Sequence, residues 1–282
     1  MMKLVVLGDF HYSRMEDGTE EMQSARDSAF SFMLERFLEL DADHHISLGD
    51  LTHEGDPEEL NFVYTVIGGS ERRFLHAIGN HDAYTLPKEQ IETLTGQPRY
   101  LAIEREEATI LVLDTSKEMN RSDWGGELDE AQLAWLEAEL VRSGEKPVLV
   151  FAHHPVYGTT ARSTLEKLSV DPRLEIEAVL KRKEGPGFYF CGHNHIHCIV
   201  RRDNWHFIQT AACLDVPAFR IVELKDGRLD VRMHRLEEAE LAEHIARFHR
   251  NMPGFSPIAE ANGEASDWEL TVELPEIAGQ RA

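Results

Sequence analysis

The sequence is poor in cysteine: Cys191, Cys198 and Cys213 are the three examples in 282 residues. An odd number of cysteines without a CxxC spacing is typical neither of a disulfide framework nor of a cysteine zinc site. We therefore expect the three thiols to be free and to pack as small, buried apolar side chains.

Positive charge is also scarce. The chain has 29 lysine and arginine residues against 51 aspartate and glutamate residues, so its net charge is -22. Such a surface repels polyanions, and the charge therefore argues against a nucleic-acid partner. The sequence also lacks any apolar run near the roughly 18 residues that cross a bilayer, and its first apolar run is too short for a secretory signal. We expect a cytoplasmic protein without a membrane partner.

Hydrophobic residues and histidine, by contrast, are plentiful. Hydrophobic residues make up 42% of the chain, and there are 15 histidines. The apolar share is enough for the core of one large domain that needs no disulfide or metal ion to hold its fold together. Several histidines lie in tight groups with aspartate and asparagine, and this mixture of side chains is typical of transition-metal sites.

Apolar periodicity predicts an α/β protein in which strands and helices alternate along the chain. The expected strands are 3–7, 44–48, 73–78, 100–103, 109–113, 147–152 and 188–191, and the expected helices are 22–40, 57–68, 87–95, 130–143 and 172–180. Four further strand-like runs follow without helices between them, which predicts a β-meander over 196–201, 205–210, 219–224 and 229–233.

The chain changes character after Arg235, so we expect a main domain over residues 1–235 and a C-terminal appendage over 236–282. A polar helix is predicted over 236–250. Beyond it, Trp268, Leu270, Val272 and Leu274 alternate with polar residues, as in a half-buried strand. Such a strand is expected either to join the core sheet or to pair with another subunit.

Polar side chains recur immediately after predicted strands. The carboxyl ends of parallel strands meet at one edge of a sheet, so these loops should converge on one crevice. Aspartate, asparagine and histidine together favour Mn, Fe, Zn or Co over Ca or Mg, and one carboxylate can bridge two ions. An extended backbone would put the side chains at i and i+2 on one side in Asp9-x-His11 and in His193-x-His195. The residues that predict a dinuclear site are Asp9, His11, Asp50, Asn80, His153, His193 and His195.

The ordered motifs resemble those of the calcineurin-like metallophosphoesterases. The motifs that carry this resemblance are Asp9-x-His11, Gly49-Asp50, Gly79-Asn80-His81-Asp82, His153-His154-Pro155 and Gly192-His193-Asn194-His195. The resemblance implies a four-layer αββα sandwich of two mixed β-sheets flanked by helices. It also implies that one ion is held by Asp9, His11 and His195, the other by Asn80, His153 and His193, with Asp50 bridging them.

The resemblance assigns roles to two further histidines and narrows the subfamily. His81 would be catalytic, contacting the phosphate and assisting the leaving oxygen, with Asp82 orienting its imidazole, while His154 would support the site. Protein Ser/Thr phosphatases carry an arginine in the second motif that is absent here, and purple acid phosphatases have an iron-ligating tyrosine where His53 stands. The chain is thus most similar to class III cyclic-nucleotide phosphodiesterases and bacterial glycerophosphodiesterases.

The function implied is hydrolysis of small phosphoesters, most of all diesters, by a metal-bound hydroxide that attacks phosphorus in line. Alternatives are a phosphomonoesterase, a DNA nuclease and a non-catalytic scaffold of the same fold. The negative charge argues against the nuclease, and the intact set of seven ligand positions argues against the scaffold. The family's tendency to dimerise leaves a homodimer open. Arg14, Arg121 and Arg162 lie on predicted substrate loops and could bind a phosphate or a leaving group, but surface solvation is the favoured interpretation for each of them.

Overall fold

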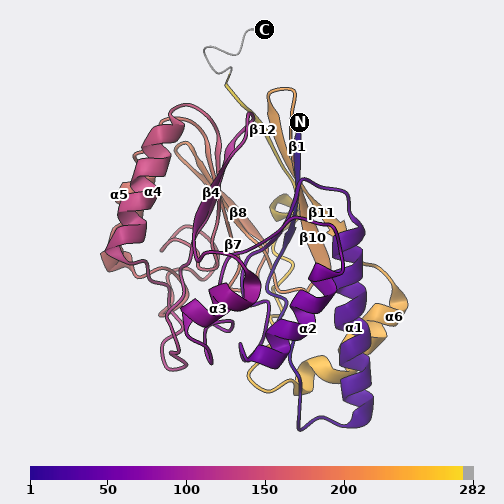
Figure 1. Ribbon diagram of the computed structural model, residues 1–282. Coiled ribbons are helices and arrows are strands. Elements are labelled where there is room, and N and C mark those ends of the chain that lie inside the picture. The colour runs from indigo at the N-terminus through magenta and orange to yellow at the C-terminus, as the bar shows by residue number, and fades with distance from the viewer. Residues whose placement is uncertain (276–282) are drawn as a thin grey trace.

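Two six-stranded mixed sheets form the centre of the computed structural model, which describes residues 1–275 (Figure 1). The strands of the first sheet, in spatial order, are β12 (Leu270–Glu273), β11 (Arg228–Arg235), β10 (Ala218–Lys225), β1 (Met2–Leu7), β2 (His44–Ser47) and β3 (Phe74–His76). Those of the second sheet are β4 (Leu101–Glu104), β5 (Thr109–Val112), β6 (Val148–Phe151), β7 (Gly187–Cys191), β9 (Trp205–Gln209) and β8 (Cys198–Arg202).

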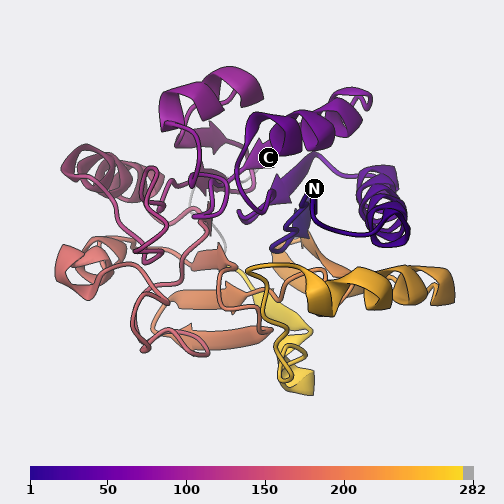
Figure 2. The same ribbon diagram turned by 90° about the horizontal axis from the view of Figure 1, so that it is seen from below.

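Helices cover the outer face of each sheet. The first sheet is covered by α1 (Glu20–Glu39), α2 (Pro57–Gly68) and α6 (Ala239–Phe248), with α3 (Lys88–Thr95) beside α2, and the second by α4 (Glu130–Ser143) and α5 (Ile176–Leu180). Figure 2 shows α1 and α6 on the opposite side of the molecule from α4 and α5. The predicted four-layer sandwich is therefore confirmed.

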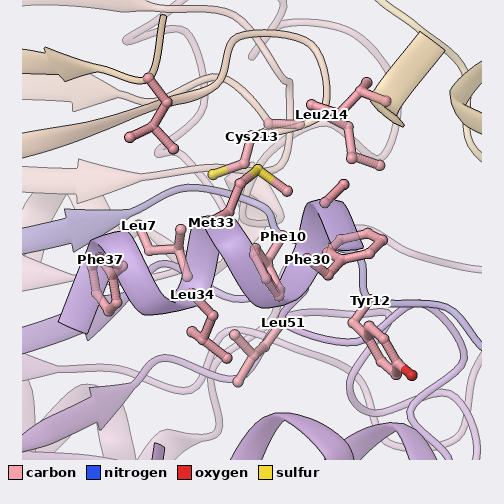
Figure 3. Packing of buried hydrophobic residues seen from close by; sticks show 14 of the residues in the cluster. Leu7, Phe10, Tyr12, Phe30, Met33, Leu34, Phe37, Leu51, Cys213 and Leu214 are labelled. Carbon is pink, nitrogen blue, oxygen red and sulfur yellow. The ribbon is translucent and has the colours of Figure 1, made fainter. Parts of the chain in front are cut away.

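Alternation along the strands builds the layers. On β1, Leu4 and Val6 lie in the apolar layer between the sheets, whereas Val5 and Leu7 lie in the layer beneath α1. Successive strand residues point to opposite faces, so the uninterrupted apolar residues 4–7 of β1 are buried on both sides of the sheet. In Figure 3 the side chains of α1 pack around Leu7 and Phe10. Leu7 ends β1, and Phe10 lies in the loop that follows it, which is the first loop of the candidate site.

Two expected elements differ from the structure. In place of one helix over 172–180 there is a short 3-10 turn, η1 (Pro172–Leu174), followed by α5, because the backbone at Glu175 takes a left-handed conformation with φ of 51°. The four late strands form two hairpins in different sheets, β8–β9 and β10–β11, and not one meander. Apolar alternation shows that a strand is half-buried, but it does not show which of two sheets receives it.

The C-terminal residues pack against the core sheet. Helix α6 contacts α1 and buries Leu241, Ile245 and Phe248, and β12 pairs antiparallel with β11. The strand predicted near the C-terminus thus joins the first sheet, while the domain boundary at residue 235 stays a prediction. Within residues 1–275 the three cysteines are free, and no helix is both long and apolar enough to cross a membrane.

The packing of β12 generates a stability prediction. Val272 is half-buried and packs against the layer between the sheets, whereas its neighbour Glu273 is exposed. Val272→Asn should lower the melting temperature by about 2–6 °C, since it removes apolar contact and half-buries an amide. The matched control Glu273→Asn should melt within about 1 °C of the wild type, because exposed substitutions cost little. Equal melting of both variants would contradict a stabilising contact between Val272 and the layer between the sheets.

Candidate metal centre

The loops that follow β1, β2, β3, β6 and β7 bring the predicted site residues to one edge of the two sheets. Two glycines let these loops approach each other closely. A Cβ atom on Gly79 would lie 2.2 Å from Oδ1 of Asp50, and one on Gly192 would lie 2.0 Å from Oδ1 of Asp9. Any larger residue at either position would push an aspartate away from the site.

The backbone at this edge is unusual. The angle φ is 55° at His11, 46° at Asp50, 67° at His193 and 55° at His195. The extended backbone expected for the two x-separated pairs is therefore absent. Non-glycine residues with positive φ are uncommon and concentrate at functional sites, where the surrounding structure holds them. Left-handed turns rather than extended strands aim these four side chains inward.

One group of side chains is centred on His153. Its Nε2 lies 3.0 Å from Oδ1 of Asn80, 3.1 Å from Nδ1 of His193 and 3.3 Å from Oδ2 of Asp50. Four ligands held about 2.1 Å from an ion in tetrahedral geometry lie about 3.4 Å from one another. The three distances from Nε2 of His153 are close to this value and thus fit a transition-metal ion.

A second group lies on the other side of Asp50. Here Nε2 of His195 is 3.1 Å from both Oδ2 of Asp9 and Nε2 of His11, and Nε2 of His11 is 3.8 Å from Oδ2 of Asp50. The ligand atoms of these four residues all lie within 4.8 Å of one another. Oδ2 of Asp50 therefore faces both groups, which is the position of a bridging ligand.

Hydrogen bonds behind the first group determine which atom of each side chain faces the centre. His153 donates through Nδ1 to the carbonyl of Leu48, and His193 donates through Nε2 to the carbonyl of Lys167, both over 2.9 Å. Asn80 donates its amide to the hydroxyl of Tyr84, which turns its Oδ1 inward. Hydrogen-bond acceptor atoms that converge in this way repel one another unless a proton or a cation lies between them. This set of nitrogen and oxygen atoms therefore fits a metal ion.

The ionisation of the group agrees with this need for positive charge. Burial raises the pKa of Asp50, but the imidazoles of His153 and His81 outweigh it and hold that pKa well below its usual value. Burial lowers the pKa of His153, yet the carboxylate of Asp50 raises it to about 9. Burial lowers the pKa of His193 to about 3 and that of His11 well below its usual value, which leaves both rings in the neutral form that binds metals.

Comparison with known proteins agrees with the fold and the site. Residues 2–197 match the family of calcineurin-like phosphoesterases. The chain belongs to this family. Together with the clusters of histidine and aspartate, family membership supports a dinuclear divalent metal centre in this protein.

Two curated relatives of this calcineurin-like phosphoesterase are similar over part of their length. A glycerophosphodiester phosphodiesterase from Enterobacter lignolyticus is 30% identical over 154 residues, which are 52% of this chain and 54% of the relative. A probable cyclic nucleotide phosphodiesterase from Rhodopseudomonas palustris is 32% identical over 157 residues, 53% of this chain and 56% of the relative. The chain thus aligns with about half the length of each. Among solved structures, a dimetal phosphatase from Danio rerio shares the fold with a TM-score of 0.69 and 16% identity, covering 83% of this chain and 96% of that one.

His81 stands beside Asp50 at the mouth of the site. Its backbone N–H donates to Oδ1 of Asp50 over 2.8 Å, and its ring donates through Nδ1 to the carbonyl of His53 over 2.6 Å. The expectation that Asp82 orients this ring is wrong. The carboxylate of Asp82 is buried, accepts from Thr52 and Gly79, and pairs with His76.

His154 lies behind the first group. Its Nδ1 is 2.8 Å from the hydroxyl of Thr115, and its Nε2 is 2.8 Å from the carbonyl of Trp124. Both ring nitrogens therefore have partners outside the centre, although the ring packs against His193. This placement is compatible with the supporting role expected for His154.

A cavity of about 510 Å³ opens over the two groups. The lining includes Arg121, Trp124 and Arg162, together with Phe255 and Ile258 from the C-terminal segment. Arg121 is paired with Glu54 over 2.6 Å. The third arginine of interest, Arg14, lies outside this cavity, because its guanidinium is held by the carboxylates of Glu16, Asp56 and Glu58.

Several residues at the site escaped the sequence analysis. His53 contacts the predicted ligand His11, and Asp215 and Phe255 contact the predicted ligand His195. His249 contacts Asp215. For His53 a signal existed, since it occupies the position of the tyrosine ligand in purple acid phosphatases. Asp215, His249 and Phe255 do not lie in the loops that carry the motifs, and no sequence pattern around them indicates a role at the site.

Proposed function

We propose that this protein is a metal-dependent hydrolase of small phosphoesters, and of phosphodiesters in particular. The observation that carries the proposal is the pair of acceptor groups on either side of Oδ2 of Asp50, at the floor of a cavity of about 510 Å³. That volume suits a small-molecule ligand. The names of the curated relatives, a glycerophosphodiester and a cyclic-nucleotide phosphodiesterase, point to the same class of substrate.

In this proposal Asp9, His11 and His195 hold one ion, and Asn80, His153 and His193 hold the other. Asp50 holds both. Mixed imidazole and carboxylate ligands favour Mn, Fe, Zn or Co. Bound there, two divalent ions supply Lewis acidity that neutralises the phosphoryl oxygens and activates water. The residues of the chain orient this chemistry through the hydrogen bonds behind each ligand.

His81 has the geometry of a proton donor. Because Nδ1 is committed to the carbonyl of His53, the second nitrogen, Nε2, is the one that can exchange a proton in the cavity that His81 lines. We propose that the protonated ring contacts a phosphoryl oxygen and gives its Nε2 proton to the departing alkoxide. A positioned general acid of this kind contributes about 10²–10⁴-fold to rate.

The alternatives fit the structure less well. A DNA nuclease must bind a polyanion, which a net charge of -22 opposes. A non-catalytic scaffold would not need seven side chains of metal-ligand type to converge, nor hydrogen-bond partners behind their rings. A phosphomonoesterase differs from a diesterase in the number of groups on phosphorus, and the assay described next separates the two. A homodimer and a cytoplasmic location stay predictions.

A panel assay tests the function. The metal-free protein is loaded with Mn, Fe, Zn or Co and offered bis-aryl phosphate, aryl phosphate, 3′,5′-cyclic AMP, a glycerophosphodiester and single-stranded DNA. We expect turnover of the diesters to exceed that of the monoester and of DNA. Preferential cleavage of the monoester would make the protein a phosphatase, and the absence of turnover with every loaded metal would contradict an enzymatic role.

The assignment of ligands predicts a pattern of metal loss. His193→Ala and His195→Ala should each bind one ion fewer than the wild type. Asp50→Asn should weaken the binding of both ions, because the carboxylate of Asp50 faces both groups. The exposed histidine of β11, His234, provides a matched control, and His234→Ala should bind two ions. Elemental analysis after dialysis measures the content. An unchanged content in Asp50→Asn would contradict the bridging role.

A second prediction separates His81 from the ligands. His81→Ala should lower turnover of a diester with a poor leaving group by about 10²-fold or more, with metal content unchanged, since the ring loses a proton transfer and not an ion. The loss should shrink for a substrate with an activated aryl leaving group, which departs without a proton. If His81→Ala instead loses an ion, His81 is a ligand and not a general acid.

A further inference from the structure

The C-terminal segment 249–258 lies against one of the two metal groups. It leaves α6 through a short turn, η2 (His249–Asn251), and reaches the cavity with Gly254, Phe255, Ser256 and Ile258. Every motif residue lies within the first 195 positions, so these contacts come from a part of the chain that carries none of the predicted ligands. They are made to the two histidines of the group that contains Asp9.

The first contact sets the tautomer of His11 through His53. Nε2 of His53 lies 2.6 Å from the carbonyl oxygen of Pro253, which can only accept, so this nitrogen carries the proton. Nδ1 of His53 is then an acceptor, and it lies 3.3 Å from Nδ1 of His11. His11 must donate through Nδ1, which leaves a lone pair on Nε2 directed at His195 and Asp50.

The second contact is made to His195 through Asp215. Oδ1 of Asp215 accepts from Nε2 of His249 over 3.2 Å and from the backbone N–H of Ile258 over 3.3 Å. Oδ2 of Asp215 is buried without a hydrogen-bond partner in residues 1–275, and it lies 3.7 Å from Nδ1 of His195. The C-terminal segment therefore holds in place the carboxylate that faces the rear nitrogen of His195.

The third contact is made by Phe255. Its ring stacks on His195 with centroids 5.4 Å apart and meets His11 edge-on at 5.2 Å. Phe255 is buried and also contacts the ring of His249. It closes the gap between the two rings and limits the tilt of both.

We propose that the segment 249–258 is a positioning element for a single metal position, the one formed by Asp9, His11 and His195. It acts through the carbonyl of Pro253 and the ring of His53 on His11, through Asp215 on His195, and through Phe255 on both. The other metal position, formed by Asn80, His153 and His193, is positioned by the carbonyls of Leu48 and Lys167 and is independent of the segment. The inference rests on the dinuclear site of the proposed function.

The test measures Co²⁺ binding rather than activity. Affinity is determined by competition with a chelator of known affinity and followed by visible absorption, which also reports coordination geometry. Each variant is made in a His193→Ala background, which leaves the position of Asp9, His11 and His195, and in a His195→Ala background, which leaves the other. Two Co²⁺ ions in the wild-type protein show that the proposed site exists before the inference is judged.

His53→Leu should lower the affinity for Co²⁺ by about 10-fold or more in the His193→Ala background, because a ligand loses the hydrogen-bond partner behind it. The affinity in the His195→Ala background should not change. His53→Gln should restore most of the affinity, because its amide can donate to Pro253 and accept from His11. Phe255→Ala should act on the same position as His53→Leu. The matched control Trp268→Ala removes a C-terminal aromatic that contacts His197 and not a ligand, and should leave both affinities unchanged.

Three results would overturn the inference. These are normal Co²⁺ affinity of His53→Leu in the His193→Ala background, equal losses in the two backgrounds, and failure of His53→Gln to differ from His53→Leu. Melting of the metal-free variants shows that each is folded, which separates a local effect on one position from general unfolding. A wild-type protein that binds no Co²⁺ would instead contradict the proposed function itself.

Discussion

The site depends on the buried carboxylate of Asp50. One of its oxygens faces His153 and His11, and the other is held by the backbone N–H of His81. A buried carboxylate is costly unless positive charge and hydrogen bonds compensate for its lost hydration. Without an ion, the proton on His153 supplies that charge. In the proposed dinuclear site, the same oxygen would face both cations. The other proposed ligands then need only to present lone pairs toward the cations, and the hydrogen bonds behind their side chains orient them for this.

The fold satisfies this constraint by bringing several short loops to one edge of two sheets. Parallel strands alone bring loops near each other but leave side chains a few ångströms apart. The last approach is made by left-handed backbone at His11, Asp50, His193 and His195, and by the glycines that precede Asn80 and His193. The cost of such conformations is met by the apolar layers on both faces of each sheet, to which the apolar residues 4–7 of β1 contribute on both sides.

The sequence predicted what local chemistry determines. The helices predicted over 57–68 and 130–143, the strand alternation and the strand-end motifs all follow from neighbouring residues, and the structure contains them. Contacts over long separations were beyond reach: His53 meets the carbonyl of Pro253 across 200 positions, and no pattern in either segment announces the other. The same limit explains the β8–β9 and β10–β11 hairpins, whose sheets differ although their patterns do not, and the orientation of His81 by a carbonyl rather than by Asp82.

Charge links the surface to the choice of substrate. A net charge of -22 acts on a long polyanion along its whole length, but salt screens it within about 8 Å, so a small anion inside the cavity responds mainly to the groups that line it. Those groups include Arg121 and Arg162, and two bound divalent ions would outweigh the carboxylates of Asp9 and Asp50. In the proposed function, this arrangement would repel nucleic acid at a distance and still attract a small phosphodiester at close range. Phe255 and Ile258 of the C-terminal segment also line the cavity, so in the proposed function they would reduce the room for a polymer beside the two metal groups.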